Sequence, residues 1–139
     1  MADSKDINNH PFADAPIIFC YTRAQALEDG VLIDVTETAK EAGFKFPTAI
    51  STAVMTDVVQ PPAIAVERGE SVEGRLWDVV FMCITKVRSP GQNVTDSEVY
   101  FEVLATGDDG ERQLHKLWAK CGPGDDGAPV ITIMMQGED

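Results

Sequence analysis

The chain has 139 residues, of which 44% are apolar, and its 23 acidic and 11 basic residues give a formal net charge of −12. This length fits one compact domain, and the apolar fraction is too high for a disordered chain. No apolar run approaches the roughly 20 residues that a membrane-spanning helix needs. The acidic beginning lacks the apolar stretch of an export signal. We therefore expect a cytoplasmic protein with no membrane partner.

The first 60 residues predict short helices that alternate with brief buried segments. Residues 1–15 carry few bulky apolar side chains and predict a flexible lead-in to a single domain over residues 16–139. Hydroxyl residues and prolines suit the start of a helix, and glycines suit its end. The expected elements are a strand at 17–20, a helix at 23–29 capped by Thr22, a buried segment at 31–35, a helix at 36–40 that Gly43 ends, and a helix that begins at Pro47 and carries Ala49, Ile50, Ala53, Val54 and Val58 on one face.

The strongest helix signal follows the break at residues 60–62. Ser71 suits the N-cap of this helix. Its apolar residues recur at helical spacing, namely Leu76, Val79, Val80, Cys83 and Val87. Because Trp77, Phe81 and Ile84 widen this stripe, we expect the helix to be buried on more than one side.

After residue 97 the pattern changes to strands. Val99, Phe101 and Val103 alternate with polar or exposed positions, which is the period of a strand with one buried face. Glycine-rich turns at 107–110 and 122–127 separate this strand from two more, expected at 114–121 and 130–135. The sequence therefore predicts an α+β fold, with several helices packed on a C-terminal three-stranded antiparallel meander.

Few residues offer catalytic or metal chemistry. His10 lies in the expected lead-in, and His115 lies on an expected strand. The spacing of Cys20, Cys83 and Cys121 matches no thiolate metal site. We expect no cofactor, no metal and no catalytic residue. Cys121, beside a glycine turn, is the thiol whose reactivity most merits a test.

Two polar–aromatic clusters and one acidic turn supply the candidate binding residues. These are Tyr21 and Arg23, then Arg75, Trp77 and Asp78, and then Cys121, Asp125 and Asp126. Arg23 sits near a helix start, where the dipole disfavours a cation, so we expect it to bind a tertiary acceptor. That acceptor is a carboxylate such as Asp78 or a backbone carbonyl. The sequence of residues 121–127 predicts a tight acidic turn. It does not favour a calcium loop, because such a loop needs more oxygen ligands.

Four ordered stretches carry a resemblance to a known family. They are residues 21–36, Ala42-Gly43-Phe44 with Pro47, residues 74–79, and residues 121–134. In these stretches the chain resembles a family of uncharacterised small bacterial proteins, a domain of unknown function common on plasmids, integrative elements and phages. The lead-in and the loop at 89–97 depart from the pattern. The resemblance implies a mobile-element setting, and it implies no reaction, cofactor or catalytic residue.

Three functions remain open. The charge disfavours direct nucleic-acid binding but suits a protein that occupies the basic groove of a nucleic-acid-binding protein. The leading hypothesis is thus a small acidic, non-enzymatic protein-binding factor of a mobile element that inhibits or modulates host nucleic-acid-handling or defence machinery. One alternative is a small-molecule or metal-dependent enzyme with a site near Tyr21, Arg23, Arg75, Asp78 and the 121–127 turn. The other is a structural homo-oligomer subunit, such as a homodimer, whose exposed strand edge pairs with a copy of itself.

Overall fold

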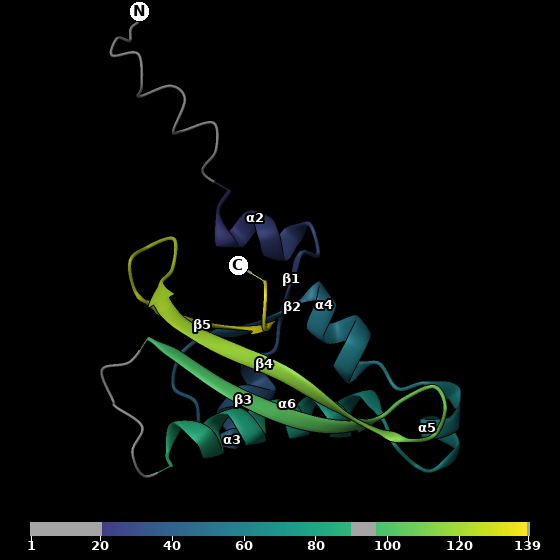
Figure 1. The fold of residues 1–139 in the computed structure, drawn as a ribbon. Coiled ribbons are helices and arrows are strands. Elements are labelled where there is room, and N and C mark those ends of the chain that lie inside the picture. The colour runs from purple at the N-terminus through teal and green to yellow at the C-terminus, as the bar shows by residue number, and fades with distance from the viewer. Residues whose placement is uncertain (1–20, 90–96, 139) are drawn as a thin grey trace, which may run out of the picture.

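A computed structural model of the protein describes residues 21–89 and 97–138, so the expected lead-in and the expected strand at 17–20 lie outside the described residues. Five strands of the described part form one mixed sheet in the order β1-β2-β5-β4-β3 (Figure 1). They are β1 (Leu32–Asp34), β2 (Thr48–Ser51), β3 (Glu98–Thr106), β4 (Arg112–Pro123) and β5 (Pro129–Met135). The α+β class is confirmed.

The sheet corrects the prediction of a three-stranded meander. β3, β4 and β5 do pair antiparallel in sequence order. β2 then pairs with β5 in parallel, and β1 closes the other edge antiparallel to β2. The sequence predicts only the meander, because β1 and β2 are three and four residues long and carry too little pattern to predict their pairing. The sheet is therefore mixed, and its central strands come from both halves of the chain.

The helix ends confirm most of the expected caps. The helices are α2 (Arg23–Glu28), α3 (Thr36–Ala42), α4 (Thr52–Val54), the π-helical η2 (Met55–Val59), α5 (Ala63–Glu67) and α6 (Val72–Val87). Thr22 forms a capping box with Gln25 at the start of α2, and the Ser71 hydroxyl accepts a hydrogen bond from the amide of Gly74 in α6. Gly43 ends α3 with φ of 117°, a conformation that favours glycine.

The helix expected to begin at Pro47 is wrong in its first half. Thr48 to Ser51 form β2, and all four residues are buried. A central strand covered on both faces shows no alternation of polar and apolar residues, so its pattern resembles a buried helix segment. The helix begins only at Thr52, where the Ser51 hydroxyl accepts a hydrogen bond from the Val54 amide.

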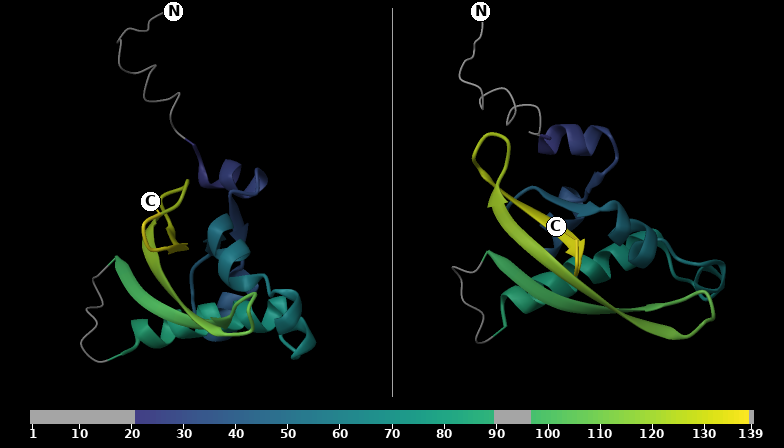
Figure 2. Two further views of the ribbon diagram at one scale, coloured as in Figure 1. Left: turned by 45° about the vertical axis from the view of Figure 1, so that its right-hand side comes forward. Right: turned by 45° about the horizontal axis from the view of Figure 1, so that its top comes forward.

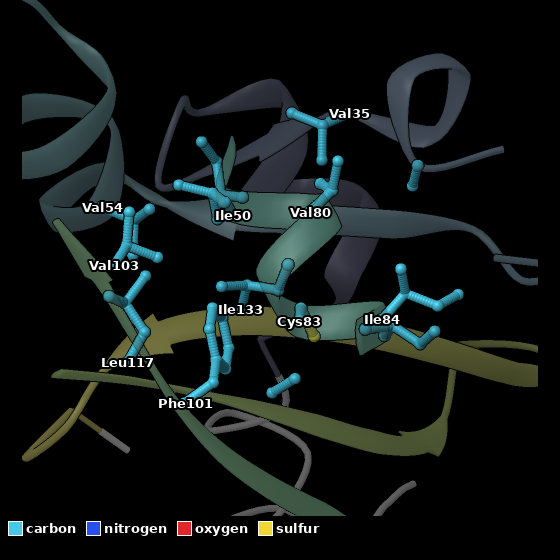
Figure 3. Close-up of a cluster of buried hydrophobic side chains, with 14 of the residues drawn as sticks. Val35, Ile50, Val54, Val80, Cys83, Ile84, Phe101, Val103, Leu117 and Ile133 are labelled. Atoms are coloured by element: carbon cyan, nitrogen blue, oxygen red, sulfur yellow. The ribbon is translucent and has the colours of Figure 1, made fainter. Parts of the chain in front are cut away.

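One face of the sheet packs on helices and forms the core. Buried side chains of α3, α4, η2 and α6 meet those of β2 to β5 there, as Figure 3 shows for Ile50, Val80, Phe101 and Ile133. α2 lies apart from α3 and α6 in every view (Figure 2), and its Arg23 bonds to β5. The expectation that α6 is buried on more than one side is wrong for Trp77 and Phe81, which are exposed and stack on each other.

Candidate functional site

A cleft lies where the turn of the β3–β4 hairpin meets η2 and the start of α6. We call residues 55–78 and 104–115 the hairpin end, and the cleft within it, of about 660 Å³, the acidic cleft. The side chains that line the cleft are mostly polar, and they include Thr56, Asp57, Gln60, Asp108, Asp109, Gln113 and His115. The base of the cleft is formed by Arg75 and Thr106.

Arg75 holds the walls of this cleft together. Its side chain is buried, with 5% exposed, although it carries a full charge. Its Nε donates to Glu70 at 3.0 Å, and its Nη2 donates to the carbonyl oxygen of Thr106 at 2.5 Å. Its Nη1 donates to the carbonyl oxygens of Val58 and Gln60 at 3.1 and 3.4 Å. One guanidinium thus joins α6, the end of β3 and the π-helical turn, so Arg75 is a structural clamp.

The turn at 107–110 presents carboxylates to the cleft. Gly110 has φ of 81°, and its amide donates to the carbonyl of Gly107, which closes a tight turn. Arg68, the C-cap residue of α5, donates to the Gly110 carbonyl at 2.8 Å and fixes the tip of the hairpin. Asp109 accepts the amide of Glu111 at 3.0 Å. Asp108 is exposed on the wall of the cleft, opposite η2.

His115 is the one histidine in the described residues, and its environment favours the neutral imidazole. Its side chain is half-buried on β4. Burial lowers the pKa of His115, the nearby charge of Asp57 partly opposes this, and the charge of Arg75 lowers the pKa further. The neutral ring can both donate and accept a hydrogen bond at the edge of the cleft.

Negative charge is concentrated at this end of the molecule. The hairpin end holds about a third of the described residues but has eight Asp or Glu against three Arg. One of those arginines, Arg75, is paired with Glu70. The other described residues carry ten acids and seven bases. Within residues 21–89 and 97–138, the acidic excess per residue is therefore greater at the hairpin end than elsewhere, as a recognition surface requires.

The predicted cluster of Arg75, Trp77 and Asp78 lines a second cavity of about 520 Å³. This cavity shares Arg75 and Thr106 with the acidic cleft, so the clamp forms the wall between them. Burial raises the pKa of Asp78, Glu70 adds to the rise, and Arg112 and Arg75 oppose it. These three residues therefore belong to the same end of the molecule as the acidic cleft.

Tyr21, Arg23 and Asp125 meet elsewhere, at a cavity of about 570 Å³ beside α2. Arg23 donates to the Thr132 hydroxyl at 2.7 Å and to the Ile131 carbonyl at 2.8 Å, which confirms a backbone carbonyl as its acceptor. Asp125 accepts the amides of Arg23 and Ala24 at 2.8 and 2.9 Å. Those bonds lower the pKa of Asp125 and hold the start of α2, which is a structural role.

Cys121 and Asp126 join neither cluster. Asp126 accepts the amide of Ala128 within its own turn at 3.0 Å. Cys121 is a half-buried free thiol at an apolar cavity of about 310 Å³, which Cys83 also lines. Burial raises the pKa of Cys83 to about 12, so that thiol is inert at neutral pH. The eight predicted residues therefore do not form one site: three lie at the hairpin end, three lie beside α2, and Cys121 and Asp126 lie apart from both groups.

Sequence reasoning missed Asp57, Asp108, Gln113 and His115 as members of one site. The signal that was present is the second Gly-Asp-Asp-Gly tetrapeptide, which spans Gly107 to Gly110 and matches Gly124 to Gly127. In residues 21–89 and 97–138, no three or more His, Cys, Asp or Glu side chains gather as metal ligands. Across the same residues, no helix has the length and apolar character to cross a membrane.

Comparison with protein-family models matches residues 7–139 to a family described as a family of unknown function (DUF6573). The chain belongs to this family. The DUF6573 match confirms the expected membership in a family of unknown function and covers all four stretches on which that expectation was based. Comparison with curated proteins and with solved structures found no match.

Proposed function

We propose that the protein is a small acidic binding factor, without catalytic activity, that occupies a basic surface on a protein partner. Its contact region is the acidic cleft and the carboxylates around it. The partner class is a nucleic-acid-handling or defence protein of the host of a mobile genetic element, whose activity the binding inhibits or modulates. The observation that carries the proposal is the excess of eight acids over three arginines at the hairpin end.

The chemistry of the cleft suits the side chains of a basic groove. Carboxylates of Asp57 and Asp108 face the same space from η2 and from the hairpin turn. A lysine or arginine inserted there gains two or more opposite charges, and the neutral ring of His115 adds no repulsion. Arg75 is the one cation in the lining, and Glu70 and three carbonyls already satisfy its donors.

This surface disfavours direct binding of nucleic acid, since phosphates are repelled by an acidic end. The enzyme alternative required Tyr21, Arg23, Arg75, Asp78 and the 121–127 turn in one cleft. Tyr21 and Arg23 line the cavity beside α2, whereas Arg75 and Asp78 line cavities at the hairpin end. The division of those residues supports binding over catalysis.

The test is capture of basic nucleic-acid-handling proteins from host lysate at low salt, followed by purified binding measurements. The variant Asp57→Asn/Asp108→Asn/Asp109→Asn removes three charges, and its amides keep the acceptor that the Glu111 amide uses. We expect at least a tenfold loss of affinity for the captured partner, about 1.4 kcal/mol or more.

The matched control is Glu28→Gln/Glu41→Gln/Asp126→Asn, which removes the same charge from exposed residues outside the hairpin end. Its affinity for the captured partner should stay within about twofold of wild type. Equal losses in the two variants would show that only total charge matters, and would refute the proposed surface. Failure of the wild-type protein to bind any basic nucleic-acid-handling protein would refute the proposed function itself.

A further inference from the structure

The face of the β3–β4 hairpin that points away from the hydrophobic core exposes several large apolar side chains. We call it the outer face; it is formed by the even-numbered residues of β3 and β4. Other elements contact its two ends, because Lys120 lines the cavity beside α2 and the Thr106 hydroxyl donates to Glu70. Tyr100, Leu104 and Leu114 are 50, 51 and 52% exposed on this face. Tyr100 stacks on Trp118 with 5.9 Å between ring centroids. Large exposed apolar side chains gathered on one face mark a contact surface.

The outer face has an ordered pattern of charges. Pairing of the two strands places Glu98 opposite Lys120, Glu102 opposite Lys116, and Thr106 opposite Arg112. The rows between them are apolar, with Tyr100 opposite Trp118 and Leu104 opposite Leu114. All the acids of this face are therefore on β3 and all the bases are on β4. Charged and apolar rows alternate along the hairpin.

This pattern is complementary to itself under one symmetry operation. A twofold axis that runs along the strands, between β3 and β4, lays a second outer face on the first with β3 over the partner's β4. In that arrangement Glu102 faces a partner Lys116, Tyr100 faces a partner Trp118, and Leu104 faces a partner Leu114. The Glu102–Lys116 row meets opposite charges, and the Leu104–Leu114 row meets an apolar row. Trp118 is already buried, with 8% exposed, so its row contributes through the exposed Tyr100. Isologous contacts of this kind are the commonest in homodimers.

We propose that the outer faces of two copies of this chain pack on each other, in this register, to form a twofold homodimer. The contact joins two sheets face to face, as in a β-sandwich. It also gives the apolar rows a partner that excludes water. Gln113 and His115 of the acidic cleft lie on the opposite face of β4, so dimerisation leaves that cleft open. The inference is therefore independent of the proposed function.

Pairing through the free edge of β3 is a weaker route to a dimer. β3 is an edge strand, and its outward residues include Glu98 and Glu102 but no Lys or Arg. A β3–β3 ladder would set glutamates near glutamates without a cation in either strand to compensate. Charged residues on an exposed edge strand are a known barrier to such pairing. Charge complementarity thus favours the face over the edge.

The experiment is a charge-exchange test by sedimentation velocity, from micromolar to millimolar protein. The wild-type protein should form a species of twice the 15.1 kDa chain mass. Glu102→Lys places lysine against the partner's Lys116, and Lys116→Glu places glutamate against the partner's Glu102. Each single variant should weaken dimerisation by about 100-fold or more, because two like-charge contacts replace two opposite-charge contacts.

Mixing the two single variants supplies the decisive arm. In a heterodimer of Glu102→Lys with Lys116→Glu, every contact of this row again joins opposite charges, so dimers should form between the two chains. Each substitution also places like charges at residues 102 and 116 of its own hairpin. If only that repulsion weakens dimerisation, the mixture stays monomeric, and this result would overturn the proposal. Glu41→Lys and Lys45→Glu, both at exposed positions away from this face, serve as controls and should stay dimeric.

Two further results would also overturn the proposal. One is a wild-type protein that remains monomeric at the highest concentration. The other is a dimer that Glu102→Lys alters but Lys116→Glu does not, which is expected for pairing through the β3 edge. Circular dichroism of each variant shows whether its fold is intact, and the mixing arm restores the dimer only from folded chains.

Discussion

β4 is flanked on both sides by the same tetrapeptide, Gly-Asp-Asp-Gly, at 107–110 and at 124–127. The two turns have matching backbone bonds. In both, the last glycine has φ near +80° and donates to the carbonyl of the first, at 3.0 Å. In both, the second aspartate accepts the amide two residues later at 3.0 Å. The local sequence therefore dictates the turn, and it does so twice in the same way.

The first aspartate is where the turns differ. Asp125 accepts two amides from the start of α2, so its charge is used inside the fold. Asp108 lies exposed on the wall of the acidic cleft, with Asp57 across the cleft on η2. The same residue in the same turn thus stabilises a helix at one end of β4 and is available to a partner at the other. What lies next to each turn decides its role.

The largest difference that we predict is between the arginines beside the two turns. Arg75→Ala should lower the free energy of unfolding by about 3 kcal/mol, because it leaves Glu70 and three carbonyls without their donor. Arg23→Ala should cost about 1–2 kcal/mol, since that side chain is only half-buried and bonds to two neutral oxygens. Urea denaturation measures both. An equal cost would contradict the clamp role of Arg75.

Asp125 and Asp108, the first aspartates of the two turns, should differ less in their contributions to stability than the two arginines do. Asp125→Ala removes an acceptor from two amides at the start of α2 and should lower the melting temperature by a few degrees. Asp108→Ala should leave the melting temperature unchanged. Because backbone hydrogen bonds lower the pKa of Asp125, its contribution should be complete above the ordinary aspartate pKa of about 4 and fade at lower pH. Thermal melts at pH 7 and pH 3 test this difference.

The smallest effect concerns the pH dependence of the hairpin end. Burial lowers the pKa of His115 in the folded protein, so the unfolded chain binds its proton more readily. Stability should therefore fall as the pH drops below the ordinary histidine pKa of about 6.5, by less than about 1 kcal/mol. His115→Gln should remove that part of the pH dependence. If the variant keeps the same slope between pH 7.5 and pH 5.5, another group is responsible.

Much of the fold could be predicted because its signals are local. Thr22, Ser71 and Gly43 mark helix ends by bonds to their own neighbours, and the alternation in β3 follows from one buried face. β2 could not be predicted from local sequence. Its four residues are buried, and they form a strand because they pair with β1 on one side and β5 on the other. The break predicted at residues 60–62 does separate η2 from α5, but the sequence did not predict α5 itself, a five-residue helix with Pro62 as its N-cap.

The candidate site could be predicted only in part. The sequence grouped Arg75, Trp77 and Asp78 because they are neighbours on one helix, and all three line one cavity. It could not join Asp57 to Asp108 and His115, because η2 and β4 meet only through the tertiary fold. It also could not tell the exposed Asp108 from the engaged Asp125, since their turns are identical in sequence.

The most direct test of the acidic surface at the hairpin end is nuclear magnetic resonance titration of the labelled protein with a short lysine-rich peptide. The amide signals of Asp57, Asp108 and His115 should move together and saturate with one affinity, which falls as salt is added. Signals of Glu28 and Glu41, at acidic positions outside the hairpin end, should move little. Shifts spread evenly over all acidic residues, or centred on α2 and α3, would contradict recognition by the hairpin end.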